Sequence, residues 1–151
     1  MSATPVNPAK PKTSSALDLA RQVLRIEADA VASLIPRLDQ GFSDAVALIL
    51  KCRGRVVVSG MGKSGHVARK IASTMASTGT PAFFVHPAEA SHGDIGMVAH
   101  DDVFIALSNS GESTELITIV PVIKRQGAKL IAITGDTGST LALEADVHLD
   151  A

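Results

Sequence analysis

The spacing of apolar residues changes once along this chain, near residue 54. Over residues 16–35 the apolar positions lie three or four apart, which is typical of an amphipathic helix, and Pro36 disturbs the pattern. A second helix is expected over residues 42–53. Beyond it, short unbroken apolar runs alternate with helical patterns, so the sequence predicts a helical start followed by alternating strands and helices.

The apolar runs are the candidate strands, expected at residues 55–59, 82–85, 103–107, 129–133 and 147–149. Helices are expected to end near residue 77, to cover 116–123 and to follow 139, with a polar loop over 86–102. Because the apolar runs are unbroken rather than alternating, they indicate a parallel sheet covered on both faces. The predicted fold class is therefore α/β, a three-layer α/β/α sheet of the flavodoxin-like or Rossmann-like kind. In such sheets, ligands bind beyond the carboxyl ends of the strands.

Residues 108–113 have the sequence SNSGES and lie between a predicted buried strand and a predicted helix. Unpaired N–H groups and the helix dipole attract an anion to such a turn, and the small serine hydroxyls let a phosphate approach closely. We interpret the turn as a phosphate cradle. The alternative is an ordinary helix start, with Asn109 as N-cap and Glu112 completing a capping box.

Composition narrows the class of protein. A chain of 151 residues is long enough for one domain with a sizeable core, and a net charge of −1 without Trp or Tyr disfavours binding to nucleic acid or to an anionic membrane. The single cysteine, Cys52, excludes an internal disulfide framework and is expected to pack as a small buried residue. No apolar run approaches the roughly 20 residues of a membrane span, so we expect a cytoplasmic protein.

The expected domain organisation is a disordered tail at residues 1–15, rich in proline and small polar residues, followed by one domain over 16–151. The last residues predict a strand that no helix follows. A parallel sheet needs that cover, so we expect the domain to be incomplete at its C-terminus.

Residues 60–65 read GMGKSG and match the GxGxxG pattern, which makes an NAD-binding dehydrogenase domain a rival hypothesis. Such a site needs an acidic residue at the end of the next strand to hold the ribose. The chain has His86 and Pro87 there, with Glu89 later in a loop, so the sequence disfavours dinucleotide binding.

Five short motifs occur in order, at residues 60–66 (GMGKSGH), 77–81 (STGTP), 84–87 (FVHP), 92–97 (HGDIGM) and 108–113. Together they resemble the sugar isomerase (SIS) domain of D-arabinose 5-phosphate isomerases, and the resemblance covers residue 17 to the end. It implies interconversion of D-ribulose 5-phosphate and D-arabinose 5-phosphate through an enediolate. That reaction is the first step toward the Kdo sugar of lipopolysaccharide, and it requires no cofactor.

The resemblance also implies roles for individual residues. Lys63 is expected to supply positive charge to the enediolate, and Glu115 is expected to act in proton transfer, while Glu112 is left as a capping residue. His86 is expected to bind an inhibitory zinc ion as well as substrate. Together with the cradle, the expected substrate contacts are Ser64, Gly79, Thr80, His86, His92, Ser108, Ser110, Ser113 and Thr118.

The resemblance further implies a homo-tetramer whose sites are assembled between subunits. It places a second acidic residue and a histidine of the active site beyond Ala151, and many members add a pair of CBS repeats. A non-catalytic phosphosugar-binding regulatory module is the alternative hypothesis. Such regulators usually carry a helix-turn-helix ahead of the sugar domain, which residues 1–15 cannot form.

Overall fold

The computed structural model describes residues 15–151, and the predicted tail lies outside the described residues except for Ser15. The contacts divide the chain into two compact units at the Pro36–Arg37 bond. The first unit contains α1 (Ala16–Ala32), whose N-cap Ser15 accepts a hydrogen bond from the Asp18 N–H. The predicted helix ends before residue 35, because the residue preceding a proline disfavours helical backbone, and the 3-10 turn η1 (Ile35–Arg37) follows.

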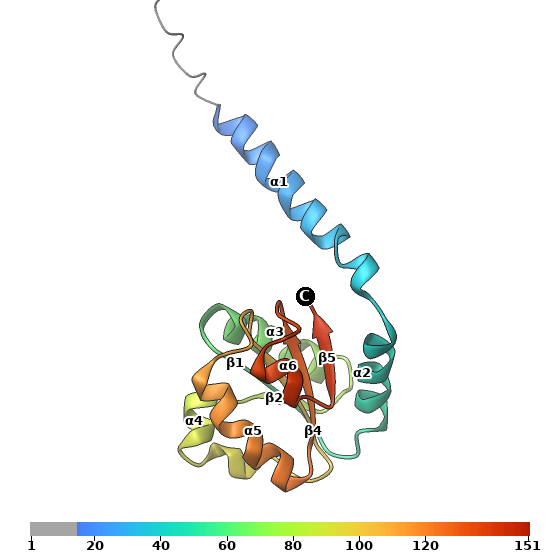
Figure 1. Cartoon of the computed structure of the whole chain (residues 1–151), viewed down its shortest axis with the longest axis vertical. Helices are drawn as coiled ribbons and strands as arrows, with labels where there is room; N and C mark the ends of the chain where they lie inside the picture. The colour runs from blue at the N-terminus through green and yellow to red at the C-terminus, as the bar shows by residue number, and fades with distance from the viewer. Residues whose placement is uncertain (1–14) are drawn as a thin grey trace, which may run out of the picture. The chain divides into compact units, whose positions relative to one another are not determined.

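The second unit is built on a five-stranded parallel sheet with strand order β2-β1-β3-β4-β5 (Figure 1). The strands are β1 (Val56–Gly60), β2 (Ala82–Phe84), β3 (Val103–Leu107), β4 (Lys129–Thr134) and β5 (Val147–Asp150). The prediction of a parallel α/β sheet is thus confirmed, with strand ends shifted by at most one residue.

Helices cover both faces of this sheet. They are α2 (Gln40–Lys51), α3 (Gly62–Ser77), α4 (Pro87–Ser91), the 3-10 turn η2 (Asp94–Met97), α5 (Thr114–Gln126) and α6 (Thr140–Glu144). Because successive strand residues point to opposite faces, Val56 and Val58 pack with α2 and α3, whereas Val57 packs with α4, α5 and α6. Each face therefore has its own apolar core. None of the helices in residues 15–151 is long and apolar enough to cross a bilayer.

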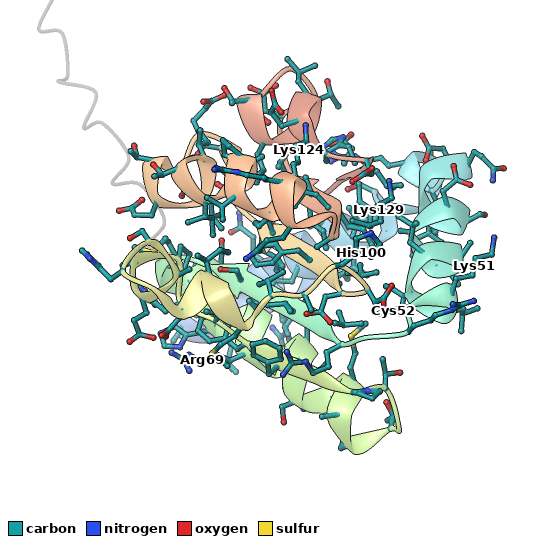
Figure 2. The ribbon with its side chains drawn as sticks, turned by 90° about the horizontal axis from the view of Figure 1, so that it is seen from below. Lys51, Cys52, Arg69, His100, Lys124 and Lys129 are labelled. Carbon is teal, nitrogen blue, oxygen red and sulfur yellow. The ribbon has the colours of Figure 1, made fainter. Side chains whose placement is uncertain are left out.

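The polar loop predicted over 86–102 is wrong in part, since α4 and η2 form within it. His86 caps α4 by accepting the Ala88 N–H at its Nδ1, and Pro87 occupies the first helical position, where its missing N–H costs nothing. Cys52 lies at the end of α2 (Figure 2). It is half-buried against the core, and its Sγ–H donates to the Asp101 carbonyl.

The strand order creates a switch point between β1 and β3. From β1 the chain passes to β2 on one side and then returns past β1 to β3 on the other. The carboxyl ends of β1 and β3 are adjacent, with Gly60 paired in register with Leu107. Connections that leave in opposite directions open a crevice at this place, which is the usual ligand position in such sheets.

Candidate functional site

A cavity of about 260 Å³ lies at the carboxyl edge, where α3 begins and where β3 and β4 end. Three predicted site residues line it, namely Lys63, Ser64 and Ser108. Asn109, which belongs to the predicted cradle, also lines it. The sequence assigns no role to the remaining lining residues, although it places the polar turn after β4 at this edge. Those residues are Val67, Leu107, Ile133, Thr134, Gly135 and Ala151.

The start of α3 leaves its backbone donors open toward this edge. Met61 is the N-cap and makes no capping bond with its side chain. The described residues provide no acceptor for the N–H groups of Gly62, Lys63 and Ser64. The exposed Lys63 adds a positive charge at the same helix end, where the dipole disfavours a cation. Open donors and a cation together make this turn suited to an anion.

The start of α5 has the same property. The helix begins at Thr114 with Ser113 as N-cap, and no side chain caps it. Within residues 15–151, the N–H groups of Thr114, Glu115 and Leu116 have no acceptor, and neither do those of Asn109 and Ser110. The alternative in which Asn109 is the N-cap is therefore wrong, because the loop continues for four more residues before helical backbone begins.

Two serines shape the loop that precedes α5. Ser108 is buried, and its Oγ accepts the Gly111 N–H at 3.1 Å. Ser110 is exposed, and its Oγ accepts the Glu112 N–H at 3.2 Å. Both hydroxyls thus turn the loop on itself and keep their own O–H protons for a further acceptor.

Glu112 does cap a helix, but not the one that follows it. Its Oε1 accepts the Thr140 N–H at 2.6 Å, at the start of α6. The first three N–H groups of α6 are all occupied, since Leu141 donates to the Gly111 carbonyl and Ala142 to Ser139 Oγ. Sequence spacing alone pointed to α5, because the partner of Glu112 lies 28 positions away.

Side-chain caps distinguish the helices of the described chain. The helices α1, α2, α4 and α6 each have an N-cap side chain that accepts a backbone N–H, from Ser15, Asp39, His86 and Ser139 respectively. The two helices without such a cap are α3 and α5, which flank the switch point. The uncapped donors thus gather where the topology opens the crevice.

Glu115 lies in the first turn of α5 and is exposed. Its carboxylate makes no ion pair or hydrogen bond with residues 15–151, so it is open to a ligand at the same helix end. Thr118 is one turn further on, and its hydroxyl donates to the Thr114 carbonyl at 2.7 Å. Thr118 therefore has its O–H proton engaged, and only its lone pairs are open to a ligand.

The two loop histidines lie at the ends of α4. His86 follows β2 at the carboxyl edge and is half-buried, whereas His92 closes α4 and is exposed. The Nε2 atom of His86 is the ring nitrogen not used in capping Ala88. Residues 15–151 contain no group of three His, Cys, Asp or Glu side chains that could hold a metal ion. A zinc ion bound to His86 would therefore need further ligands from outside residues 15–151.

Gly79 and Thr80 are not brought to this site. They follow the end of α3 and precede β2, which places them at the amino edge of the sheet, opposite the cavity. The Thr80 N–H donates to the Met75 carbonyl, so the turn closes on its own helix. Within one chain, these two residues and Lys63 lie at opposite edges.

The chain matches a known protein family and several curated proteins. The family model described as SIS domain matches residues 49–151. The arabinose 5-phosphate isomerase KdsD of Pseudomonas aeruginosa is 58% identical over 132 residues, covering 87% of this chain and 40% of that relative. KdsD of Escherichia coli K12 is 55% identical over 129 residues, covering 85% of this chain and 39% of the relative. The chain thus spans about 40% of the length of the curated relatives it matches.

A solved structure extends the comparison to three dimensions. The protein c3406 of E. coli CFT073, in complex with A5P, matches with a TM-score of 0.84 and 43% sequence identity. The match covers 91% of this chain and 74% of that one.

Proposed function

Because the chain belongs to the SIS domain family, we propose that residues 16–151 form the sugar isomerase domain of a cytoplasmic arabinose 5-phosphate isomerase. The reaction interconverts D-arabinose 5-phosphate and D-ribulose 5-phosphate and supplies lipopolysaccharide biosynthesis with the precursor of Kdo. The high identity to KdsD isomerases and the A5P complex of c3406 support this substrate.

One observation carries the proposal. The two helices that begin at the switch point, α3 and α5, are the two without a side-chain cap among the helices described. Their open N–H groups, with Lys63 at the start of α3, form a pair of donor sets suited to a phosphate and to a developing oxyanion. A purely structural helix start gains about 1 kcal/mol from a cap, so leaving two uncapped favours a ligand there.

The chemistry follows from the isomerisation. In the open-chain sugar, a base removes the C2 proton of arabinose 5-phosphate, and an enediolate forms with its charge on the two oxygens. Return of a proton to C1, with transfer of a proton from O2 to O1, gives ribulose 5-phosphate. Glu115 is the proposed base, because its carboxylate is unengaged in the described structure, and Lys63 stabilises the enediolate charge.

The remaining residues bind substrate in this proposal. Ser64, Ser108, Ser110 and Ser113 take the phosphate together with the open N–H groups, and Thr118 extends the contact along α5. His86 and His92 contact the sugar hydroxyls. The Nε2 atom of His86 also takes the inhibitory zinc ion, with ligands supplied from outside residues 15–151.

A homo-tetramer is proposed for two reasons. If Gly79 and Thr80 contact substrate, they must do so in the site of another subunit, because their own chain places them at the opposite edge from Lys63. Helix α1 contains no buried residue, and α2 carries a stripe of exposed apolar side chains at Phe42, Val46 and Leu50 besides the face that it packs on the sheet. Exposed apolar side chains that gather on one helix face are typical of subunit contacts.

The experiment is proton NMR of the chain with D-arabinose 5-phosphate in heavy water, which follows loss of the C2 proton signal. Wild-type protein is expected to exchange this proton, and Lys63→Ala is expected to slow the exchange at least tenfold because the enediolate loses its counter-charge. The matched control is Lys70→Ala, which removes an exposed lysine of the same helix that does not line the cavity.

Binding without exchange in wild-type protein would mean either that the chemistry needs the active-site residues expected beyond Ala151 or that the domain is the regulatory phosphosugar-binding module. Absence of both exchange and ligand line broadening would contradict the proposed site. Equal loss of exchange in the Lys63→Ala and Lys70→Ala variants would show that Lys63 has no specific part in it.

A further inference from the structure

Two neighbouring loops meet at the carboxyl edge of the sheet. The serine loop, residues 108–113, follows β3, and the α6 loop, residues 135–139, follows β4. The serine loop carries open backbone donors, whereas the α6 loop supplies Gly135 to the cavity lining. The position of the serine loop therefore depends on what fixes it to its neighbour.

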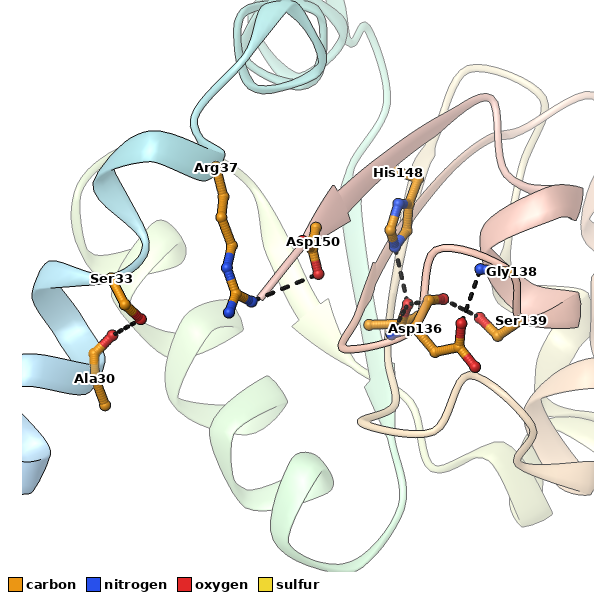
Figure 3. Close-up of polar contacts among 9 residues, drawn as sticks. Ala30, Ser33, Arg37, Asp136, Gly138, Ser139, His148 and Asp150 are labelled. Atoms are coloured by element: carbon orange, nitrogen blue, oxygen red, sulfur yellow. Dashed lines mark hydrogen bonds and ion pairs between the residues drawn. The ribbon is translucent and has the colours of Figure 1, made fainter.

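The α6 loop is fixed by its own polar contacts (Figure 3). The Asp136 carbonyl accepts from both Thr134 Oγ1 and Ser139 Oγ, at 2.9 and 2.7 Å. Asp136 Oδ1 accepts the Gly138 N–H at 2.8 Å, and the buried Thr134 also contacts His148 Nε2 at 2.8 Å. These contacts within the α6 loop make it a preorganised support for the serine loop.

Three hydrogen bonds join the serine loop to this support. Gly135 N–H donates to the Asn109 carbonyl at 3.0 Å, and Leu141 N–H donates to the Gly111 carbonyl at 3.1 Å. The third runs from Thr140 N–H to Glu112 Oε1 at 2.6 Å. It is the one of the three that uses a side chain, and it is charge-assisted, which makes it the strongest by type.

We propose that Glu112 is a positioning residue for phosphate binding. Its carboxylate ties the serine loop to the first N–H of α6 and so holds the open donors of Asn109 and Ser110 in place for the ligand. The inference rests on the proposed function, in which the serine loop takes the phosphate group. Glu112 acts through the loop and does not itself touch the substrate, because a carboxylate there would repel phosphate.

The positioning role of Glu112 requires an acceptor atom and does not require a charge. This requirement distinguishes positioning from a purely electrostatic effect of the carboxylate. Glu112→Gln keeps an Oε1 that accepts the Thr140 N–H, whereas Glu112→Ala removes the acceptor. Loss of the bond leaves the loop with only its two main-chain links to the support. The donors then sample positions in which they no longer converge on the ligand.

The test is titration calorimetry of the full chain with D-arabinose 5-phosphate, combined with the amide spectrum of Thr140. Glu112→Ala is expected to weaken binding about tenfold and to remove the hydrogen-exchange protection of the Thr140 amide. Glu112→Gln is expected to bind within about twofold of wild type and to retain the protection. The matched control is Glu144→Ala, at the other end of α6, where the lost partner is Lys124 in the last turn of α5.

Equal affinity of Glu112→Ala and wild type would overturn the inference. So would a Glu112→Gln variant as weak as Glu112→Ala, because the effect would then come from charge. Absence of binding in wild-type protein would contradict the proposed function itself, and inorganic phosphate as a second ligand would show whether the cradle or only the sugar contacts had failed.

Discussion

The starts of α5 and α6 make an instructive pair. Both helices follow neighbouring strands of one sheet and begin at the same edge. At α6 the first three N–H groups are taken by Glu112, by the Gly111 carbonyl and by Ser139. At α5 the corresponding three have no acceptor among residues 15–151. The protein thus satisfies the donors of a helix that supports the site and leaves open those of a helix that meets the ligand.

This comparison indicates that neighbouring residues of the serine loop have different functions. Gly111 and Glu112 turn toward α6 and stabilise the fold, whereas Asn109, Ser110 and Ser113 leave their backbone donors unengaged. Substitutions at Gly111 or Glu112 should therefore change the contact with α6, and binding only through it. Substitutions at Ser113 should change the open donors directly.

The largest expected effect on stability is at Gly111, one of the two residues of the serine loop that contact α6. This buried residue has φ of 65°, and a Cβ there would lie 2.0 Å from Ser139 Oγ. We expect Gly111→Ala to lower the free energy of unfolding by about 3 kcal/mol, since both backbone strain and a clash with the α6 start are added. Urea unfolding followed by circular dichroism measures the change.

The control for that variant is Gly138→Ala, in the neighbouring α6 loop. Its Cβ would meet only Asp136 Oδ1, at 3.4 Å, in ordinary contact. We expect the free energy of unfolding of Gly138→Ala to lie within about 0.5 kcal/mol of the wild-type value. Similar losses in both variants would mean that the apposition of Gly111 and Ser139 is not what stabilises the loop pair.

A smaller effect is expected when the start of α5 is given a side-chain cap like that of α6. Stability should rise, whereas affinity for the ligand should fall. Ser113→Asp places a strong N-cap carboxylate at a helix start that has no side-chain cap. The variant should gain about 0.5–1 kcal/mol of stability and lose at least tenfold in affinity for D-arabinose 5-phosphate, because the carboxylate occupies the donors and repels phosphate.

Thermal unfolding and titration calorimetry check the two halves of this prediction. Ser77→Asp, an exposed serine at the end of α3, adds the same charge at the opposite edge and should leave affinity unchanged. A Ser113→Asp variant that binds as tightly as wild type would argue that the α5 start does not receive the phosphate.

The smallest effect is expected at the amino edge, where a protein carboxylate already occupies a backbone donor. Asp146 accepts the Leu130 N–H and the Lys129 Nζ, each at 2.8 Å; Lys129 is labelled in Figure 2. Partial burial raises the pKa of Asp146, but the hydrogen bonds from Leu130 and Lys129 outweigh it, so the pKa lies below its ordinary value. A lowered pKa in the folded state stabilises the protein above the unfolded pKa of about 3.9.

Asp146→Asn should therefore lower the free energy of unfolding by about 1 kcal/mol at pH 7. The difference from wild type should shrink as the pH falls below about 4, because wild-type Asp146 then becomes protonated too. Urea unfolding at pH 7 and pH 3 measures both values, and Asp29→Asn, which lies in the separate helix α1, serves as the control. A difference that stays constant over this range would show that ionisation of Asp146 has no part in stability.

The architecture of the second unit can be predicted from the sequence. Unbroken apolar runs predict the parallel strands, and the direction of those strands places the polar turns at residues 60–65 and 108–113 at the carboxyl edge. These features depend on local periodicity and on the direction of strands, which a short window of sequence contains. Ser108, in the predicted cradle, and Lys63 and Ser64, which the family resemblance implied, all line the cavity.

The contacts between groups far apart in the sequence come from the folded arrangement of the strands and loops. Glu112 caps α6 rather than α5, Thr134 and Asn109 line the cavity, and Gly79 lies at the far edge from Lys63. Each of these facts depends on strand order or on a contact between residues many positions apart. Spacing rules describe neighbours along one helix or strand, so they cannot select among partners that the sheet brings together from different parts of the sequence.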